Sequence, residues 1–341
     1  MTKWQKWKMR VFHWEFWPFW FFYLPVFVWY AILSLRERSF FYFSAANPNM
    51  DMGGMMGASK SQIFNDIPHQ YLPETILITA EKRDTLDQLS AEIGFPLVAK
   101  PDAGERGRGV EKINSLNELM QYASDMPYNF LLQEMVWYPV ELGVFYVRHP
   151  SWQNGSVTSV VRKDFLKVVG DGVHTLSQLL NLNERASLQF DKTSLSDQEL
   201  TVVPIKGREI IVEHIGNHRR GTAFLDATAE ADAALTEAID TLSKQIPNFF
   251  YGRFDLKCAS IDDLRNLKNF KILELNGAAS EPAHIYQPGF SLFKAYRIVF
   301  WHHLMLANIS RANRRNGFSY LSHREGMKRA RAFFAKQKTA N

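Results

Sequence analysis

The chain has 341 residues, 46% of them hydrophobic, and a formal net charge of +5, so it can form one large domain or two modest ones around a sizeable core. Its single cysteine, Cys258, excludes an internal disulfide and fits a reducing compartment. No zinc-finger, RRM or homeodomain pattern accompanies the basic residues, so no nucleic-acid partner is expected.

The first 45 residues differ in composition from the rest of the chain. Six of the nine tryptophans lie within the first 30 residues, and the chain opens with Lys3, Lys6, Lys8 and Arg10 before any acid. Residues 16–35 form a run of 20 residues without a charge, about the length that spans a bilayer as a helix. Two prolines and many aromatic residues make an interfacial anchor or a re-entrant hairpin an equal alternative, and a signal peptide cleaved near residues 43–46 is a third alternative. We predict residues 1–45 as a membrane-anchoring segment that contacts lipid, either as a transmembrane helix or along the surface.

Residues 46–58 are predicted as a turn-rich linker, because Asn, Pro and Gly interrupt any regular period. A mixed α/β (α+β) pattern begins at Ser59. Strands are expected at 75–79, 96–100, 130–133, 141–147, 156–161, 252–258 and 270–275. Helices are expected at 85–93, from 115 onward, and at 176–183, 229–245 and 292–308. The pattern predicts a core domain over residues 59–290 and a helical basic tail over residues 291–341.

The predicted tail combines an apolar helix with a basic end. The apolar stripe of residues 292–308 favours core packing over membrane contact. From Arg311 to Lys338 there are nine Lys or Arg residues and one acid, Glu325. This basic stretch suits an anionic membrane surface, and a solvated helix face is the alternative.

A glycine-rich loop follows the strand that ends at Lys100. Gly104, Gly107 and Gly109 let backbone N–H groups approach phosphate oxygens, and the lysine can neutralise their charge. The loop lacks the Gly-Lys-Ser/Thr of a Walker A motif. It therefore suggests a phosphate site only in combination with other motifs.

Polar residues interrupt two late apolar strands. Glu274 and Asn276 lie two positions apart, so both point to one face of their strand. Asp255 on the neighbouring strand adds a third oxygen ligand suited to Mg²⁺, and Arg253 shares its face. A cation beside such a cluster can stabilise a phosphoryl group in transfer.

A third polar group follows the strand that ends near residue 133. Gln133 and Glu134, followed by Val136, are compatible with a hinge that meets an adenine edge, and Glu141 could accept hydrogen bonds from ribose. A strand end running into a surface turn is the commoner reading of this spacing.

In their order and spacing these segments resemble the ATP-grasp fold, closest to the D-alanine–D-alanine ligase and the cyanophycin or glutathione synthetase branches. The resemblance covers about residues 59 to 290 and is carried by Ser59-Lys60, LPET, FPLVAKPDAGERGRGV, LLQEMV, VELGV, YGRFDLK and ILELNGAASEPAH. Residues 168–176 and the 216–222 loop are similar to further segments of the synthetase branch. The resemblance implies two lobes, each with an antiparallel sheet, that sandwich ATP.

The resemblance also implies roles for individual residues. Lys60 and Lys100 would contact the ATP phosphates under a flap formed by the Gly104–Gly109 loop. Gln133, Glu134 and Val136 would line the adenine pocket, and Glu141 would hold the ribose. Asp255, Glu274 and Asn276 would bind two Mg²⁺ ions, with Mn²⁺ as a substitute. Arg253 and Lys163 would act at the phosphates, and the acceptor carboxylate or acyl phosphate would be gripped by Asn217, Arg219 and Arg220.

The expected activity is an ATP- and Mg-dependent ligase that activates a carboxylate as an acyl phosphate and couples it to an amine. A kinase of the same fold and a nucleotide-binding membrane protein without catalysis are the alternatives. The need for ATP places the catalytic domain on the cytoplasmic side of the inner membrane and argues against a cleaved signal peptide. The Rossmann-like domain that precedes the core in related ligases has no counterpart in the first 59 residues, which suggests a membrane-proximal substrate. The sequence leaves both substrates and the oligomeric state open.

Overall fold

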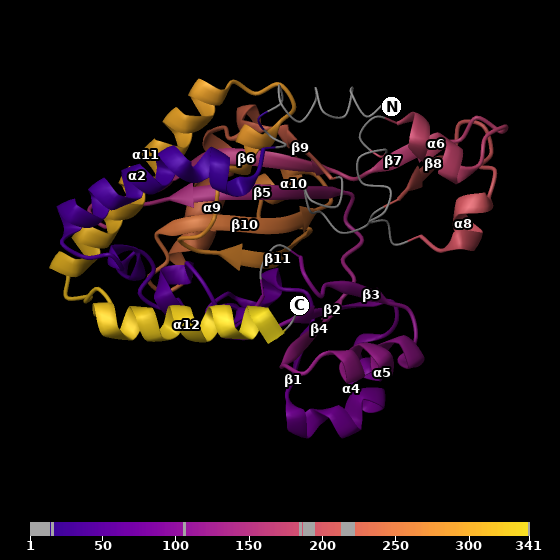
Figure 1. The fold of residues 1–341 in the computed structure, drawn as a ribbon, viewed down its shortest axis with the longest axis horizontal. Helices are drawn as coiled ribbons and strands as arrows, with labels where there is room; N and C mark the ends of the chain where they lie inside the picture. The colour runs from indigo at the N-terminus through magenta and orange to yellow at the C-terminus, as the bar shows by residue number, and fades with distance from the viewer. Residues whose placement is uncertain are drawn as a thin grey trace.

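The computed structural model describes Trp14 and residues 17–104, 107–183, 186, 195–212 and 222–339. Two antiparallel sheets dominate this part of the chain (Figure 1). The mixed α/β fold with antiparallel sheets that the sequence predicts is thereby confirmed.

The smaller of the two sheets has four strands in the order β1-β4-β2-β3. They are β1 (Thr75–Ile78), β4 (Phe130–Glu134), β2 (Leu97–Pro101) and β3 (Glu111–Ile113). Helices α4 (Leu86–Ile93) and α5 (Leu116–Asp125) pack on this sheet and share a buried cluster with it. The glycine-rich loop joins β2 to β3, so this lobe carries both Lys100 and the loop.

The larger sheet has five strands in the order β11-β10-β5-β6-β9. They are β11 (Phe270–Asn276), β10 (Tyr251–Cys258), β5 (Val140–Val147), β6 (Ser156–Asp164) and β9 (Ala223–Asp226). Helices α9 (Ala233–Lys244) and α10 (Ile261–Arg265) cover one face, where alternate strand residues such as Val144, Phe254 and Leu256 are completely buried. The period of two along each strand leaves the intervening residues on the opposite face.

A small two-stranded sheet of β7 (Lys167–Val169) and β8 (Glu209–Ile211) packs with α6 (Leu176–Leu182) and α8 (Asp197–Thr201) at one side of the molecule (Figure 1). The Gly-Asp-Gly segment after β7 forms a turn in which Asp171 accepts hydrogen bonds from the backbone N–H groups of Val173 and His174. Thr175 then caps α6 in a capping box with Gln178. Local hydrogen bonds therefore account for this part of the sequence motif.

Helices α2 (Phe19–Glu37) and α11 (Leu292–Arg315) run side by side along the larger sheet (Figure 1). Phe22 stacks on Tyr296 at 5.1 Å between ring centroids, and the Trp29 indole donates to the carbonyl of Phe300. Within the described residues no helix is both long and apolar enough to cross a membrane. The predicted transmembrane helix is therefore not found, and part of the apolar surface that suggested it packs against α11.

The predicted linker lies inside the fold. Ala46 and Met52 of the linker are buried in one cluster with residues of β5, β10 and α11, and Phe41, Tyr42 and Phe43, just before the linker, belong to the same cluster. Asn47 accepts hydrogen bonds from the backbone of Phe250 and Tyr251. Helix α12 (His323–Thr339) packs across this segment, with Gly326 against the Phe41 ring. The domain limits at residues 45, 58 and 290 stay a prediction, and contacts cross each of them.

The remaining short elements connect these layers. Helix α3 (Lys60–Asn65) starts at a Ser59 N-cap. Short 3₁₀ helices are η2 (Tyr42–Ala45), η3 (Asp51–Gly54), η4 (His69–Tyr71), η5 (Ala80–Thr85), η8 (Thr228–Glu230) and η9 (Ala283–Tyr286). The β7–β8 pair and α8 were not anticipated, and the predicted helix 229–245 begins only at Ala233 because Asp232 caps it.

Candidate functional site

Charged side chains occupy the face of the five-stranded sheet that α9 leaves free. They come from Glu141 on β5, Lys163 on β6 and Asp255 with its neighbours Arg253 and Lys257 on β10. The antiparallel register sets Asp255 opposite Gly143 and Lys257 opposite Glu141. A Cβ atom on Gly143 would lie 2.8 Å from Val161 Cγ1 and 3.3 Å from Asp255 Oδ1, so a larger residue at this position would crowd both side chains.

Asp255 is the centre of this group and is only 4% exposed. Its carboxylate accepts from Arg253 Nη2 at 2.8 Å and from Asn276 Nδ2 at 2.9 Å, and lies 3.3 Å from Lys163 Nζ. Burial acts to raise the pKa of Asp255, but the charges of Arg253 and Lys163 outweigh it and hold the pKa below its usual value. The ionised carboxylate is thus fully compensated inside the protein.

Lys163 connects Asp255 to Glu141, whose Oε1 lies 2.9 Å from the lysine Nζ. Burial acts to lower the pKa of Lys163, but Asp255 and Glu141 raise it above its ordinary value. Lys257 lies on the other side of Glu141 at 3.9 Å and donates to the carbonyl of Val136 at 3.2 Å. Sequence reasoning missed Lys257, although its position two residues after Asp255 places it on the same strand face.

Two lysines reach this sheet from the smaller lobe. Lys100 Nζ donates to Gln133 Oε1 at 2.8 Å and, across the lobe boundary, to the carbonyl of Leu273 on β11 at 2.9 Å. Burial lowers the pKa of Lys100 to about 7. Lys60 Nζ lies 3.4 Å from Glu274 Oε1 and donates to the carbonyl of Gly104 in the glycine-rich loop. The structure therefore brings the predicted phosphate-binding lysines together with the predicted metal strand.

The residues predicted at the adenine ring lie where β4 leads into β5. Gln133 is buried and donates to Thr75 Oγ1 while it accepts from Lys100. Glu134 Oε2 accepts from the backbone N–H of Glu74, and the carbonyl of Val136 accepts from Lys257. These side chains support the junction of the two lobes, and their contact with a nucleotide stays a prediction.

The glycine-rich loop shows why glycine is required at two of its positions. Gly107 and Gly109 have φ values of 68° and 66°, in the left-handed region that residues with a Cβ rarely adopt. Gly104 supplies the carbonyl that Lys60 binds. Residues 105 and 106, between these glycines, lie outside the described part of the chain.

The predicted metal ligands lie on adjacent strands. The register pairs Asp255 with Glu274 and Arg253 with Asn276, and a β-bulge follows Asp255. The bulge keeps Glu274 on the charged face while Leu275 and Ile272 enter the core. No group of three or more His, Cys, Asp or Glu side chains that could hold a metal occurs among the described residues. Two carboxylates and one amide, as predicted, are nevertheless an oxygen donor set that fits Mg²⁺ or Mn²⁺.

Two features of the site have no signal in the sequence. The carboxylate of Glu281 accepts hydrogen bonds from Tyr23 on α2 and from Tyr286, and its backbone carbonyl accepts from Arg253 Nη1 at 3.2 Å. Burial raises the pKa of Glu281 to about 7. Gly277, next to Asn276, packs so closely on the 50–57 segment that a Cβ atom would lie 2.5 Å from the Gly53 carbonyl oxygen. The N-terminal segment therefore builds part of the site.

Three predicted residues are not placed. Asn217, Arg219 and Arg220 belong to the 213–221 segment, which lies outside the described residues. Their proposed role at the acceptor carboxylate or acyl phosphate stays a prediction.

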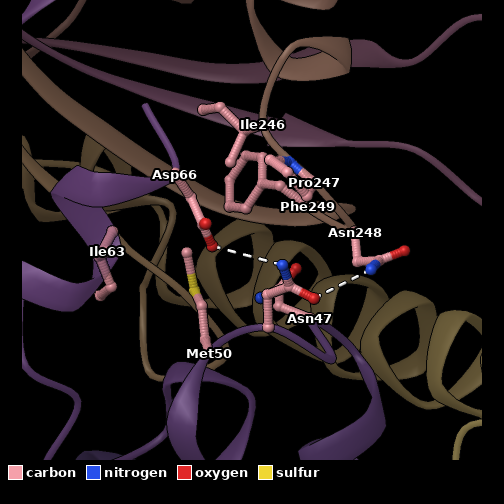
Figure 2. Close-up of a pocket in the computed structure, with 9 residues that line it drawn as sticks. Asn47, Met50, Ile63, Asp66, Ile246, Pro247, Asn248 and Phe249 are labelled. Carbon is pink, nitrogen blue, oxygen red and sulfur yellow. Dashed lines mark hydrogen bonds between the residues drawn. The ribbon is translucent and has the colours of Figure 1, made fainter. Parts of the chain in front are cut away.

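A separate small pocket lies behind the linker and is lined by Asn47, Met50, Asp66 and Phe249, among others (Figure 2). Its volume of about 10 Å³ is close to the space of one water molecule. Hydrogen bonds from Asn49 to Asp66 and from Asn248 to Asn49 cross it. None of the predicted site residues lines it, so we assign it to packing.

Comparison with known proteins gives no family model and no curated protein that matches the chain. Among solved structures it is similar to a bifunctional glutathione synthetase from Pasteurella multocida (17% identity, 71% of this chain, TM-score 0.36). It is also similar to a D-alanine–D-alanine ligase from Bacillus anthracis (12% identity, 79% of this chain and 72% of that one, TM-score 0.44). A third likeness is to the VanG D-Ala:D-Ser ligase from Enterococcus faecalis (13% identity, 77% of this chain and 64% of that one, TM-score 0.41). The chain spans 35% of the length of the glutathione synthetase.

Proposed function

We propose that the protein is an ATP-grasp ligase that uses ATP to activate a substrate carboxylate and couples it to an amine. The observation that carries the proposal is the meeting of two lobes at one charged cluster. Lys60 and Lys100 reach β11 from the four-stranded lobe, while Arg253, Asp255 and Lys163 line the five-stranded sheet beside it. Four cations around carboxylates on adjacent strands form a site for a polyphosphate with its metal ions.

The proposed chemistry needs no protein nucleophile. A carboxylate oxygen of the substrate attacks the γ-phosphorus of ATP, the bond from that phosphorus to the bridging oxygen breaks, and ADP leaves. The amine then attacks the acyl carbon, loses a proton and releases inorganic phosphate. Such reactions are accelerated by positioning and by charge stabilisation, which fixed cations can supply.

The residues divide these tasks by location. Lys60, Lys100 and Lys163 bind phosphate oxygens, Glu141 accepts from the ribose hydroxyls, and Arg253 faces the phosphoryl group in transfer. Mg²⁺ held by Asp255, Glu274 and Asn276 would neutralise phosphate charge. Because the reaction consumes ATP, we propose that this domain acts on the cytoplasmic side of the inner membrane; cell fractionation and protease protection test this placement.

Hydroxylamine trapping tests the ligase proposal. Purified protein, Mg-ATP and an extract of small molecules and lipids are incubated with hydroxylamine, and hydroxamates are sought by mass spectrometry. We expect a hydroxamate with the native protein and none with Glu274→Ala. Glu209→Ala is the matched control, because Glu209 is an exposed acid on β8 that pairs with Lys167. A phosphorylated product without a hydroxamate would identify a kinase, and ATP binding without any product would identify a protein that binds nucleotide without catalysis.

A further inference from the structure

One face of helix α2 is apolar and exposed, although the opposite face is packed in the protein. Trp20, Leu24, Val28 and Leu35 are 66%, 58%, 58% and 79% exposed. The helical period places these residues on one side of α2, and the same side includes Phe21, Phe27 and Ile32. We call these seven residues the α2 apolar face.

The size of this surface is unusual for a protein surrounded by water. Seven large apolar side chains, each about half exposed or more, present an area on the order of several hundred Å². Contiguous apolar patches of that size commonly mark a site for a partner or a membrane. Single exposed apolar residues scattered over a surface do not indicate a binding site, but the seven residues of the α2 apolar face extend along the whole helix.

Exposed cations lie on α11, the helix that packs beside α2, and at the end of α2. On α11, Lys294 and Arg297 are exposed beside Tyr296, which stacks on α2, and Phe293 and Trp301 extend the apolar surface. At the end of α2, Arg38 is exposed. The one acid of α2, Glu37, is 4% exposed and pairs with Arg36 and Arg311. In the sequence, four further basic residues precede α2.

We propose that the α2 apolar face docks in the headgroup region of an anionic bilayer, with α2 lying in the plane of the membrane. Trp, Phe and Leu on one side of a helix with Lys and Arg around it are the composition of interfacial membrane helices. Anionic lipid complements the exposed cations Arg38, Lys294 and Arg297 at the end of α2 and on the neighbouring helix. A second copy of the chain does not complement these cations. Pairing two α2 faces would bring the cations together, and α2 has no exposed acid to neutralise them. The docking is independent of the reaction proposed above.

Vesicle co-sedimentation of the full chain tests the proposal. We expect binding to phosphatidylcholine vesicles that contain phosphatidylglycerol, weaker binding without it, and a lower affinity in high salt. Leu24→Glu/Val28→Glu should reduce the partition coefficient at least tenfold. Val173→Glu/Ile205→Glu, which changes two exposed apolar residues near the two-stranded β7–β8 sheet in the same way, should leave it unchanged.

Two further measurements keep the result unambiguous. Thermal unfolding compares the folding of all variants, and Trp20→Ser/Leu35→Ser provides a second, uncharged change of the same face, which should also weaken binding. Equal vesicle binding by the native protein and both α2 variants would overturn the proposal, as would the absence of binding to either vesicle. A dimer in solution that these changes dissociate while vesicle binding persists would assign the face to a second copy instead.

Discussion

The two faces of the five-stranded sheet are built from the same strands but from opposite kinds of residue. On β10, Phe254, Leu256 and Cys258 are completely buried toward α9, and burial raises the pKa of the Cys258 thiol to about 11. On the other face of β10, Arg253, Asp255 and Lys257 belong to a connected group of charges. One face therefore contributes stability through apolar packing, while the other concentrates charges that pair with one another.

Burying the charged face costs free energy, and the fold tolerates this cost because the carboxylates are paired with lysine and arginine side chains. Removing one partner of a buried ion pair leaves an uncompensated charge, which costs about 3–5 kcal/mol. Substitutions on the two faces should therefore lower stability for different reasons, and only those on the charged face should abolish activity in the folded protein.

The largest effect is expected for Asp255→Asn. The amide cannot neutralise Arg253 and Lys163, so we expect the free energy of unfolding to fall by about 3–5 kcal/mol and ATP turnover to fall by about 10³-fold or more. Urea denaturation and ADP release measure the two effects. Asp164→Asn, the same change at an exposed position of β6, is the control and should alter neither. An unchanged urea midpoint in Asp255→Asn would contradict the role of Asp255 as the centre of the group.

On the opposite face, Leu256→Ala should reduce stability alone. Leu256 is fully buried in the cluster with α9, so its truncation should cost about 2–5 kcal/mol. We expect ATP turnover per folded molecule to stay within about threefold of the native value, a change of less than 1 kcal/mol in the barrier. Turnover at low temperature, corrected for the folded fraction, checks this. A loss as large as that of Asp255→Asn would show that the two faces are not separable.

The smallest effect concerns pH and Glu281. Its pKa rises from 4.5 in the unfolded chain to about 7 in the fold, so the folded protein binds more protons between these values. Its contribution to stability is therefore present below pH 4.5 and is lost as the pH rises to about 7, by about 3 kcal/mol.

Glu281→Gln removes this titration and keeps one carbonyl oxygen that can accept from one of the two tyrosine hydroxyls. We expect the difference in unfolding free energy between Glu281→Gln and the native protein to grow in favour of the variant from about pH 5 to pH 8. Denaturation curves at several pH values measure it. A constant difference across this range would show that Glu281 ionises normally in the fold.

The amino-acid sequence alone determined much of the secondary structure and the candidates for the site. The period of two placed Arg253 with Asp255 and Glu274 with Asn276, because alternate residues of a strand share a face whatever the rest of the fold does. The Lys100 strand and its loop could be located because glycines that require positive φ act locally. The same local reasoning left residues 16–35 open between a transmembrane helix and an interfacial segment, since composition does not reveal which side of a helix the protein covers.

Only the tertiary structure decided which of these residues meet. Lys100 reaches Leu273, and Tyr23 reaches Glu281 across 258 positions of sequence, because packing of separate lobes and helices sets those distances. Gln133 forms hydrogen bonds with Lys100 and Thr75 at the junction of the two lobes. A β-bulge after Asp255 determines the sheet face to which Glu274 points. Periodicity and turn preferences follow from backbone geometry within a few residues, whereas contacts between distant segments depend on how the whole core packs.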